Sequence, residues 1–167
     1  IQLLPISRLI GPCMMVPHFD VIREDEVSDY FVAEALRATE SPLALLFGSP
    51  HCDTCVTLRS QFAAYVSEMD GKDPRASFIW VNTGNSNSGE LLLQGDVVDS
   101  RQEFAATELG RRIYNDRFGV IAAAFGLMTS PAMIVIGADG LVAEKPYVGR
   151  AAIKRWESWA AMHSQPS

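Results

Sequence analysis

An apolar run that stops at a Cys-x-x-Cys motif places the strongest constraint on the fold of this chain. Residues 43 to 47 are all apolar, and the turn-forming residues 48 to 50 follow them before Cys52 and Cys55. A short apolar run closed by turn residues is typical of a strand that is buried on both faces. The sequence therefore predicts a buried strand, a short turn and a helix whose first turn carries both cysteines.

The residues after the motif have the spacing of an amphipathic helix that ends at Asp70 and Gly71. Its apolar stripe recurs at intervals of three and four residues and consists of Val56, Leu58, Phe62, Tyr65, Val66 and Met69. Cys52 is expected at the helix start, where unpaired backbone N–H groups and the helix dipole stabilise a thiolate over a thiol. We therefore expect Cys52 to be the reactive group. Cys55 is less exposed and is placed to resolve a mixed disulfide.

Three further residues flank the two cysteines in the motif, namely His51, Asp53 and Thr54. A protonated His51 would add to the stabilisation of the Cys52 thiolate, whereas the carboxylate of Asp53 would oppose it. We expect these three residues to be neighbours of the reactive thiol rather than groups that react themselves.

A metal site is an alternative interpretation of the same motif. Two thiolates can bind zinc or copper, with Cys13, His18 or His51 as completing ligands. The sequence has neither a second Cys-x-x-Cys nor a His-x-x-x-His, and a helix start stabilises thiolates without a metal. We therefore expect no metal and no organic cofactor.

Composition limits the class of protein. The chain has 167 residues, of which 48% are hydrophobic and 20% are charged, as is typical of one globular domain with a substantial core. A net charge of −6 without a cluster of Lys and Arg argues against nucleic acid or an anionic membrane surface as the main partner. No apolar run is long enough to cross a bilayer, so we expect no transmembrane segment in this chain.

The three cysteines bear on the compartment. They are too few for a scaffold held by disulfides and instead resemble a redox or metal pair with one odd thiol, Cys13. We expect Cys13 to be idle or buried, with an intermolecular disulfide or exchange with Cys52 as alternatives. The sequence begins at Ile1 rather than Met, which is consistent with the removal of a signal peptide or anchor.

The remaining elements alternate along the chain. Residues 1 to 17 are broken by prolines and predict an extension packed on the domain surface, and residues 18 to 22 predict an edge strand. Asp25, Glu26 and Asp29 then predict the first turn of a helix. After the Cys helix we expect a strand at 78–81, a helix from 98 to about 118, a short helix at 121–125, a strand at 132–136, a hairpin partner at 141–143 and a last helix from about 151 to 163.

This order predicts an α/β fold. Strands and helices alternate as β-α-β-α-β-α-β-β-α, with the last two strands joined by the turn at residues 137 to 140. Connection rules then favour a central mixed sheet with helices on both faces.

The order resembles that of the thioredoxin superfamily over residues 18 to 163, which leaves residues 164 to 167 as a tail. In that family a cis-proline faces the active-site cysteines, and Pro131 matches it by position. The resemblance implies that Ser130 offers its backbone amide and carbonyl to an incoming peptide strand and so helps to hold a substrate cysteine.

Two departures from the family pattern favour its exported members. Many cytosolic thioredoxins have Trp-Cys-Gly-Pro-Cys and a buried acid six residues before the first cysteine, whereas this chain has His-Cys-Asp-Thr-Cys and Leu46. The connection from residue 82 to residue 129 also far exceeds the about 10 to 12 residues that a crossover needs. This surplus predicts a helical insertion at about 83–118, similar to those of periplasmic, Dsb-like members.

The sequence and its resemblance together predict a thiol-disulfide oxidoreductase. Its partners would be cysteine-containing protein clients and a redox partner protein, and its compartment the periplasm or another exported location, with the cytoplasm as the alternative. A second alternative is a binding or assembly module on the same scaffold, in which Cys52 and Cys55 form a structural disulfide. The metal-binding protein described above is the third.

Overall fold

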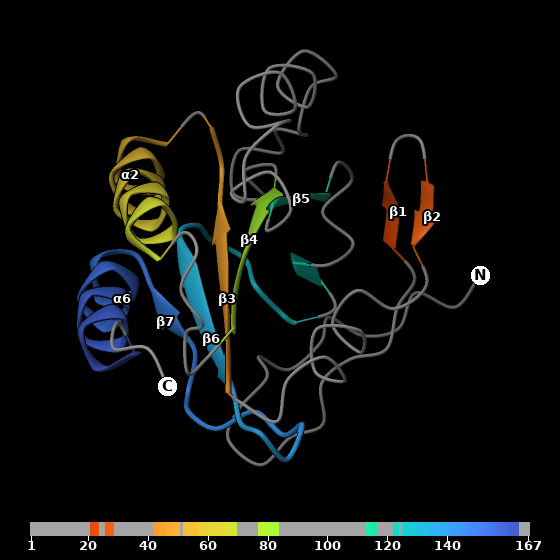
Figure 1. Ribbon diagram of the computed structural model, residues 1–167. Helices are drawn as coiled ribbons and strands as arrows, with labels where there is room; N and C mark the ends of the chain where they lie inside the picture. Colours follow the sequence, from red (N-terminus) through yellow and green to blue (C-terminus); the bar gives the residue numbers. More distant parts are fainter. Residues whose placement is uncertain are drawn as a thin grey trace.

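The computed structural model describes residues 21–23, 26–28, 42–50, 52–69, 77–83, 113–116, 122–123 and 125–163. These residues form the strands and helices labelled in Figure 1. In chain order they are β1 (Val21–Arg23), β2 (Glu26–Ser28), β3 (Leu43–Gly48), α2 (Asp53–Glu68), β4 (Ser77–Thr83), β5 (Ile113–Asp116), β6 (Ala132–Ile136), β7 (Tyr147–Val148) and α6 (Arg150–His163).

The centre of the fold is a five-stranded mixed sheet with the strand order β5-β4-β3-β6-β7. Strand β3 pairs in parallel with β4 and antiparallel with β6, β4 pairs in parallel with β5, and β6 pairs antiparallel with β7. Every residue of β3 and β6 is buried, as the two apolar runs predicted. Because β3 is the middle strand, the turn after it lies at the centre of the sheet, at the carboxyl end of β3, and leads into α2.

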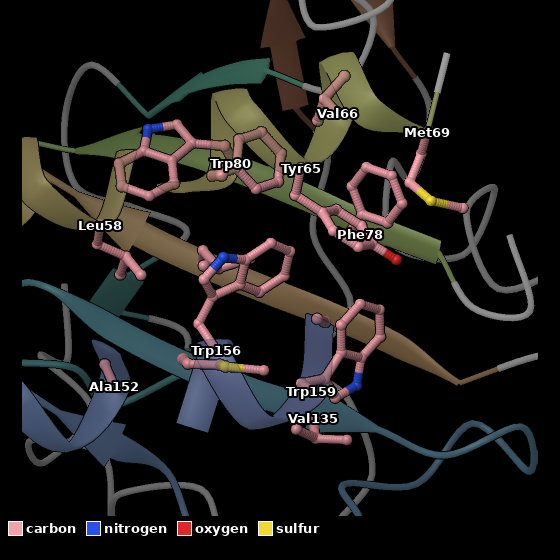
Figure 2. Close-up of a cluster of buried hydrophobic side chains, with 14 residues drawn as sticks. Leu58, Tyr65, Val66, Met69, Phe78, Trp80, Val135, Ala152, Trp156 and Trp159 are labelled. Atoms are coloured by element: carbon pink, nitrogen blue, oxygen red, sulfur yellow. The ribbon is translucent and has the colours of Figure 1, made fainter. Parts of the chain in front are cut away.

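Helices α2 and α6 cover the same face of this sheet (Figure 1). Strand residues on this face, among them Ala44, Leu46 and Trp80, pack with residues of both helices. This face is rich in aromatic side chains: Figure 2 shows Tyr65, Phe78, Trp80, Trp156 and Trp159 gathered between the helices and the strands. Phe62 lies at the centre of the group, with its ring 5.6 Å from Trp156, 5.7 Å from Trp80 and 5.8 Å from Phe78.

The opposite face of the sheet is mainly aliphatic. It carries alternate residues of the central strands, and Ala122, Phe125 and Leu127 pack on it. Phe47 and Phe125 make an edge-to-face ring contact at 5.7 Å. This contact joins the end of β3 to the segment that leads into β6.

The Cys helix and the last helix confirm their predictions closely. Helix α2 runs from Asp53 to Glu68 with Met69 as its C-cap, and α6 runs from Arg150 to His163. One residue of the predicted apolar stripe of α2 is wrong, because Val56 is 48% exposed. The helix turns this side chain to the surface one turn after Cys52.

Two predicted helices are wrong where the structure describes them. Glu26–Ser28 was expected to begin a helix, but it is strand β2, which pairs antiparallel with β1 in a separate two-stranded sheet. The edge strand expected at residues 18 to 22 therefore belongs, where described, to this small sheet and not to the central one. Ile113–Asp116 was expected in the helix from 98 to about 118, but it is β5, paired with the end of β4.

The hairpin after β6 is partly as predicted. Leu141 accepts the N–H of Gly137 at 2.8 Å, and Val142 forms an isolated bridge with Ile136. The regular strand that pairs with β6 is β7, however, a few residues further along the chain. The predicted turn thus forms, while most of the pairing comes from Tyr147 and Val148.

Several predictions fall outside the described residues. They are the extension at 1–17, the rest of the helix that was expected to start near Asp25, the part of the insertion at 84–112, and the tail at 164–167. The short helix predicted at 121–125 is described in part, with Ala122 and Ala123 helical.

Candidate functional site

The N-terminus of α2 places Cys52 at the surface end of the site. Cys52 is the N-cap of the helix, with extended backbone angles (φ −116°, ψ 123°), and its side chain is partly exposed. Its Sγ accepts the backbone N–H of Cys55 at 3.2 Å. A sulfur atom that receives a helix N–H is stabilised when it carries negative charge. The sequence-based expectation that Cys52 begins the helix is therefore correct.

Cys55 lies one turn further along α2 and is only 1% exposed. Burial raises the pKa of its thiol from 9.0 to about 12, and a hydrogen bond with Cys52 acts in the same direction. Hydrogen bonds with the Ser130 side chain and the Ser49 backbone act against this rise. Both cysteines are free thiols in the structure. The pair therefore combines one accessible sulfur with one that stays protonated at neutral pH.

Cys55 and Trp80 both lie next to Gly48, at the end of β3. A Cβ on Gly48 would lie 2.4 Å from Cζ2 of Trp80, 2.7 Å from its Cη2 and 3.3 Å from Cβ of Cys55. The indole ring and the cysteine thus share the space that a side chain at residue 48 would fill. Only glycine fits there without moving the indole. The indole Nε1 donates to Oδ1 of Asn82 at 2.7 Å, and both residues are buried.

A tight turn at Gly126 leads into the loop that faces Cys52. Gly126 has a positive φ of 70°, its N–H donates to Ala123 O, and the N–H of Leu127 donates to Ala122 O, both at 2.9 Å. This pattern is that of a Schellman motif, which ends a helix and favours glycine. Below the turn, the buried Asp116 accepts the N–H of Ala122 at 2.9 Å, which ties the loop to the end of β5.

The same loop places Ser130 and Pro131 beside the cysteines. The Cys52 thiol donates to the carbonyl of Ser130 at 3.9 Å, and the peptide bond between Ser130 and Pro131 is cis. The carbonyl of Pro131 accepts the N–H of Gly149 at 2.8 Å, so the start of β6 is held by the residue that follows β7. The structure therefore brings together four of the residues that the sequence singled out, namely Cys52, Cys55, Ser130 and Pro131.

The other residues of the motif are placed less centrally. Asp53 and Thr54 form the first two positions of α2, where Asp53 is exposed and Thr54 is half-buried. His51 lies outside the described residues. Near the cysteines the surface carries the exposed apolar side chains of Val56 and Met128, at 48% and 59% exposure.

The sequence led us to expect neither a metal site nor a transmembrane segment, and the structure bears on both only over the residues that it describes. Among these residues no group of three or more His, Cys, Asp or Glu side chains is placed to hold a metal ion. The completing ligands considered for a metal site, Cys13, His18 and His51, are outside this part. None of the helices described has the length and apolar character needed to cross a membrane.

Comparison with known proteins identifies the fold. Neither a protein-family model nor a curated protein matches the chain, but solved structures do. A secreted disulfide oxidoreductase of Mycobacterium tuberculosis, described as homologous to Escherichia coli DsbE, superimposes with a TM-score of 0.56 at 18% identity, over 87% of this chain and 96% of the other. This chain has a thioredoxin-like fold.

Two further structures agree with this thioredoxin-like fold. StoA from Bacillus subtilis gives a TM-score of 0.53 at 20% identity, over 72% of this chain and 83% of its own. The thioredoxin domain of a thiol-disulfide oxidoreductase from Bacteroides vulgatus gives 0.58 at 12% identity, over 90% and 99%. The resemblance to the thioredoxin superfamily, and to its Dsb-like members, is therefore confirmed at the level of the fold.

Sequence reasoning missed the roles of Gly48, Trp80 and Asn82. Trp80 was expected only as one apolar residue of a buried strand, and Gly48 only as part of a turn. The pairing of β3 with β4 sets Gly48 opposite Asn82 and Leu46 opposite Trp80. No signal in the sequence gives this register. The sequence predicted only that two consecutive strands joined by a helix would be parallel neighbours.

Proposed function

We propose that this protein is a thiol-disulfide oxidoreductase that exchanges disulfides with protein clients through Cys52 and Cys55. The observation that carries the proposal is the contrast between the two sulfurs at one helix start. The Sγ of Cys52 is partly exposed and accepts a helix N–H, whereas Cys55 is buried one turn away. An accessible nucleophile next to a protected second thiol is the arrangement that two-step disulfide exchange requires.

In the reducing direction the reaction has two balanced steps. The Cys52 thiolate attacks a client disulfide, so that a bond between Cys52 and the client forms and one client thiolate leaves. The Cys55 thiol then loses its proton to solvent, and its sulfur attacks Cys52 and displaces the second client thiolate. Two electrons pass from the cysteine pair to the client. Oxidation of a client dithiol follows the same steps backwards.

The loop before β6 supplies the docking surface in this proposal. The Ser130 carbonyl faces Cys52, and an extended client segment that paired with the Ser130 backbone would bring its own sulfur over Cys52. Met128, two residues earlier, is 59% exposed and offers an apolar contact that adapts to different client side chains. Cysteine-containing protein segments are therefore the substrates that we propose, together with a redox partner protein that resets the pair.

Removal of each thiol tests the proposal. Cys52→Ser should abolish the reduction of a peptide disulfide, while Cys55→Ser should still attack it and accumulate a mixed disulfide, detected by intact mass. If Cys52→Ser kept wild-type activity, the pair would be structural and the binding-module alternative would hold. Zinc and copper analysis of the purified chain tests the metal alternative in the same preparation.

The direction of exchange is decided by the reduction potential of the pair. We propose an exported oxidoreductase, supported by the fold that the chain shares with a secreted disulfide oxidoreductase and by the apolar Leu46, which is 0% exposed beneath the site. Equilibration with glutathione should then give a value of about −120 to −200 mV, whereas a value near about −270 mV would indicate a cytosolic type of reductant.

A further inference from the structure

Trp80 and Asn82 form a hydrogen-bonded pair next to Gly48 and Cys55, and neither the motif nor the fold assigns this pair a role. A Cβ on Gly48 would meet both the Trp80 indole and the β-carbon of Cys55, so the indole and the cysteine border the same small space. The Nε1 of Trp80 donates to Asn82 at 2.7 Å, and both residues are at most 2% exposed. This hydrogen bond fixes the direction of the indole, whose six-membered ring lies over Gly48.

The position of the indole depends on the strand register. Asn82 is the partner of Gly48 across β3 and β4, and Trp80 is the partner of Leu46. Gly48 has no side chain, and the indole occupies the space that this leaves above the strand. The ring is held from the other side by Phe62, at 5.7 Å between centroids. Figure 2 shows Trp80 at the end of the aromatic cluster, on the side of Leu58.

We propose that Trp80, oriented by Asn82, is a positioning residue that keeps water from the buried side of Cys55 and thereby slows the resolving step. This inference rests on the proposed function, because it concerns the second step of that exchange. Because the resolving step is slow, the mixed disulfide with the client persists. The client is released only when Cys55 is placed to attack Cys52.

The groups around Cys55 support a slow second step. Within the described residues, the side chains that alter the pKa of Cys55 are Cys52 and Ser130, together with the Ser49 backbone. Burial is the largest cause of the raised pKa, and it persists when Cys52 is bound to a client. The neighbours on β3 and β4, namely Leu46, Gly48, Trp80 and Asn82, do not titrate. On α2 the charged residues nearest in sequence are Asp53, which is exposed, and Arg59.

Replacement of Trp80 by Phe should remove this barrier. A phenyl ring lacks the atoms that lie over Gly48 and leaves Oδ1 of Asn82 without the indole donor. The space that the smaller ring leaves is lined by the polar Asn82 side chain, and a space with polar partners can hold water. Water beside Cys55 lowers the cost of charging its sulfur. The thiolate that performs the second step then forms at lower pH.

The experiment follows the release of thionitrobenzoate from Ellman's reagent by stopped flow, in the full chain with Cys13→Ser. The first release depends on reagent concentration and reports Cys52. The second is unimolecular and reports attack by Cys55, with the Cys52–Cys55 disulfide and a second thionitrobenzoate as products. For the wild type, the second rate should rise roughly tenfold per pH unit between about pH 6 and 9 without a plateau, because the thiolate is the nucleophile.

The variants separate the role of Trp80 from general loosening of the core. Trp80→Phe should accelerate the second release at pH 7 by about tenfold or more, which corresponds to one unit of pKa, while the rate should still rise with pH across the measured range. Trp156→Phe, in the same aromatic cluster, should keep the wild-type profile. Asn82→Ala should shift the profile in the same direction by less, and it serves if Trp80→Phe does not fold.

The possible results distinguish the two proposals. If the second release occurs but Trp80→Phe and Trp156→Phe both follow the wild-type profile, or if the wild type itself reaches a plateau by about pH 8, the inference about Trp80 is overturned. If the wild type shows no unimolecular second release, disulfide exchange by the pair fails, and the inference fails with it.

Discussion

The two faces of the central sheet differ in composition and in what they contribute to the site. The face under α2 and α6 is rich in aromatic side chains, and at Gly48 and Trp80 it borders Cys55. The opposite face is mainly aliphatic and anchors, through Phe125 and Leu127, the loop that brings Ser130 to Cys52. One face therefore lies beside the buried sulfur, and the other holds the loop that lies beside the exposed one. The comparison predicts that mutations on the two faces alter different steps.

The largest expected effect is on the stability of the aromatic face. Trp156→Ala should lower the free energy of unfolding by about 3 to 5 kcal/mol, because the ring contacts Tyr65 at 5.2 Å and stacks on Trp159 at 5.5 Å. Urea denaturation followed by circular dichroism measures the change. Met162→Ala on the same helix is the control: its side chain is 63% exposed, and its effect should stay within about 0.5 kcal/mol. A loss below about 1 kcal/mol for Trp156→Ala would show that the cluster is not well packed.

A smaller effect is expected on the aliphatic face, with a different consequence. Phe125→Leu should cost about 1 to 2 kcal/mol and should also slow the attack of Cys52 on a peptide disulfide about three- to tenfold, because the loop with Ser130 loses its anchor on Phe47. The second-order rate constant measures this. Phe78→Leu on the aromatic face should cost similar stability and leave that rate unchanged. Equal rates for the two variants would contradict the division between the faces.

The smallest effect is expected at the rim of the aromatic face. Glu144 accepts two hydrogen bonds from Arg155 of α6 and one from Tyr147, each at 2.8 Å. The hydrogen bonds with Arg155 hold the pKa of Glu144 below its usual 4.5. The pair therefore stabilises the fold above pH 4.5, and this contribution is lost as the pH falls through the lowered pKa.

Replacement of Glu144 tests whether its negative charge stabilises the fold. Glu144→Gln should lower the free energy of unfolding at pH 7 by about 1 kcal/mol or less, because the pair lies near the surface. Urea denaturation at pH 7 and at about pH 3.5 compares the variant with the wild type. The difference should shrink at the lower pH. A difference that grew towards acid would mean that Glu144 acts by some means other than its charge.

Sequence patterns were sufficient where the apolar residues within one element decide which of its side chains are buried. The prediction was right for β3 and β6, which are continuous apolar runs, and for α2 and α6, which have apolar stripes. In each of them the spacing of the apolar residues matches the period of the element. The motif and the position of Pro131 likewise led to four residues that the fold brings together. Their placement follows from local rules about helix starts and turns.

The failures have a different physical origin. The strands β2 and β5 are short and are stabilised by pairing with a neighbour, as Ile113 pairs with Trp80. A strand of three or four residues has too few side chains to show its period, and its pairing partner is a tertiary property. The same reason hid the contact of Trp80 with Gly48, because it depends on the register of two strands. Val56 was assigned to the packed stripe although its side chain lies on the exposed side of α2.

The chain's three tryptophans all lie in the aromatic cluster, and this gives the protein a built-in optical reporter. Trp156 and Trp159 are stacked with 19° between their planes, while Trp80 lies at the other end of the cluster, against the cysteine pair. Emission from the native chain therefore comes from a single neighbourhood of coupled indoles. Since Trp80 and Cys55 border the same space at Gly48, we expect a rearrangement at the cysteines to change the intrinsic fluorescence, which needs no added label.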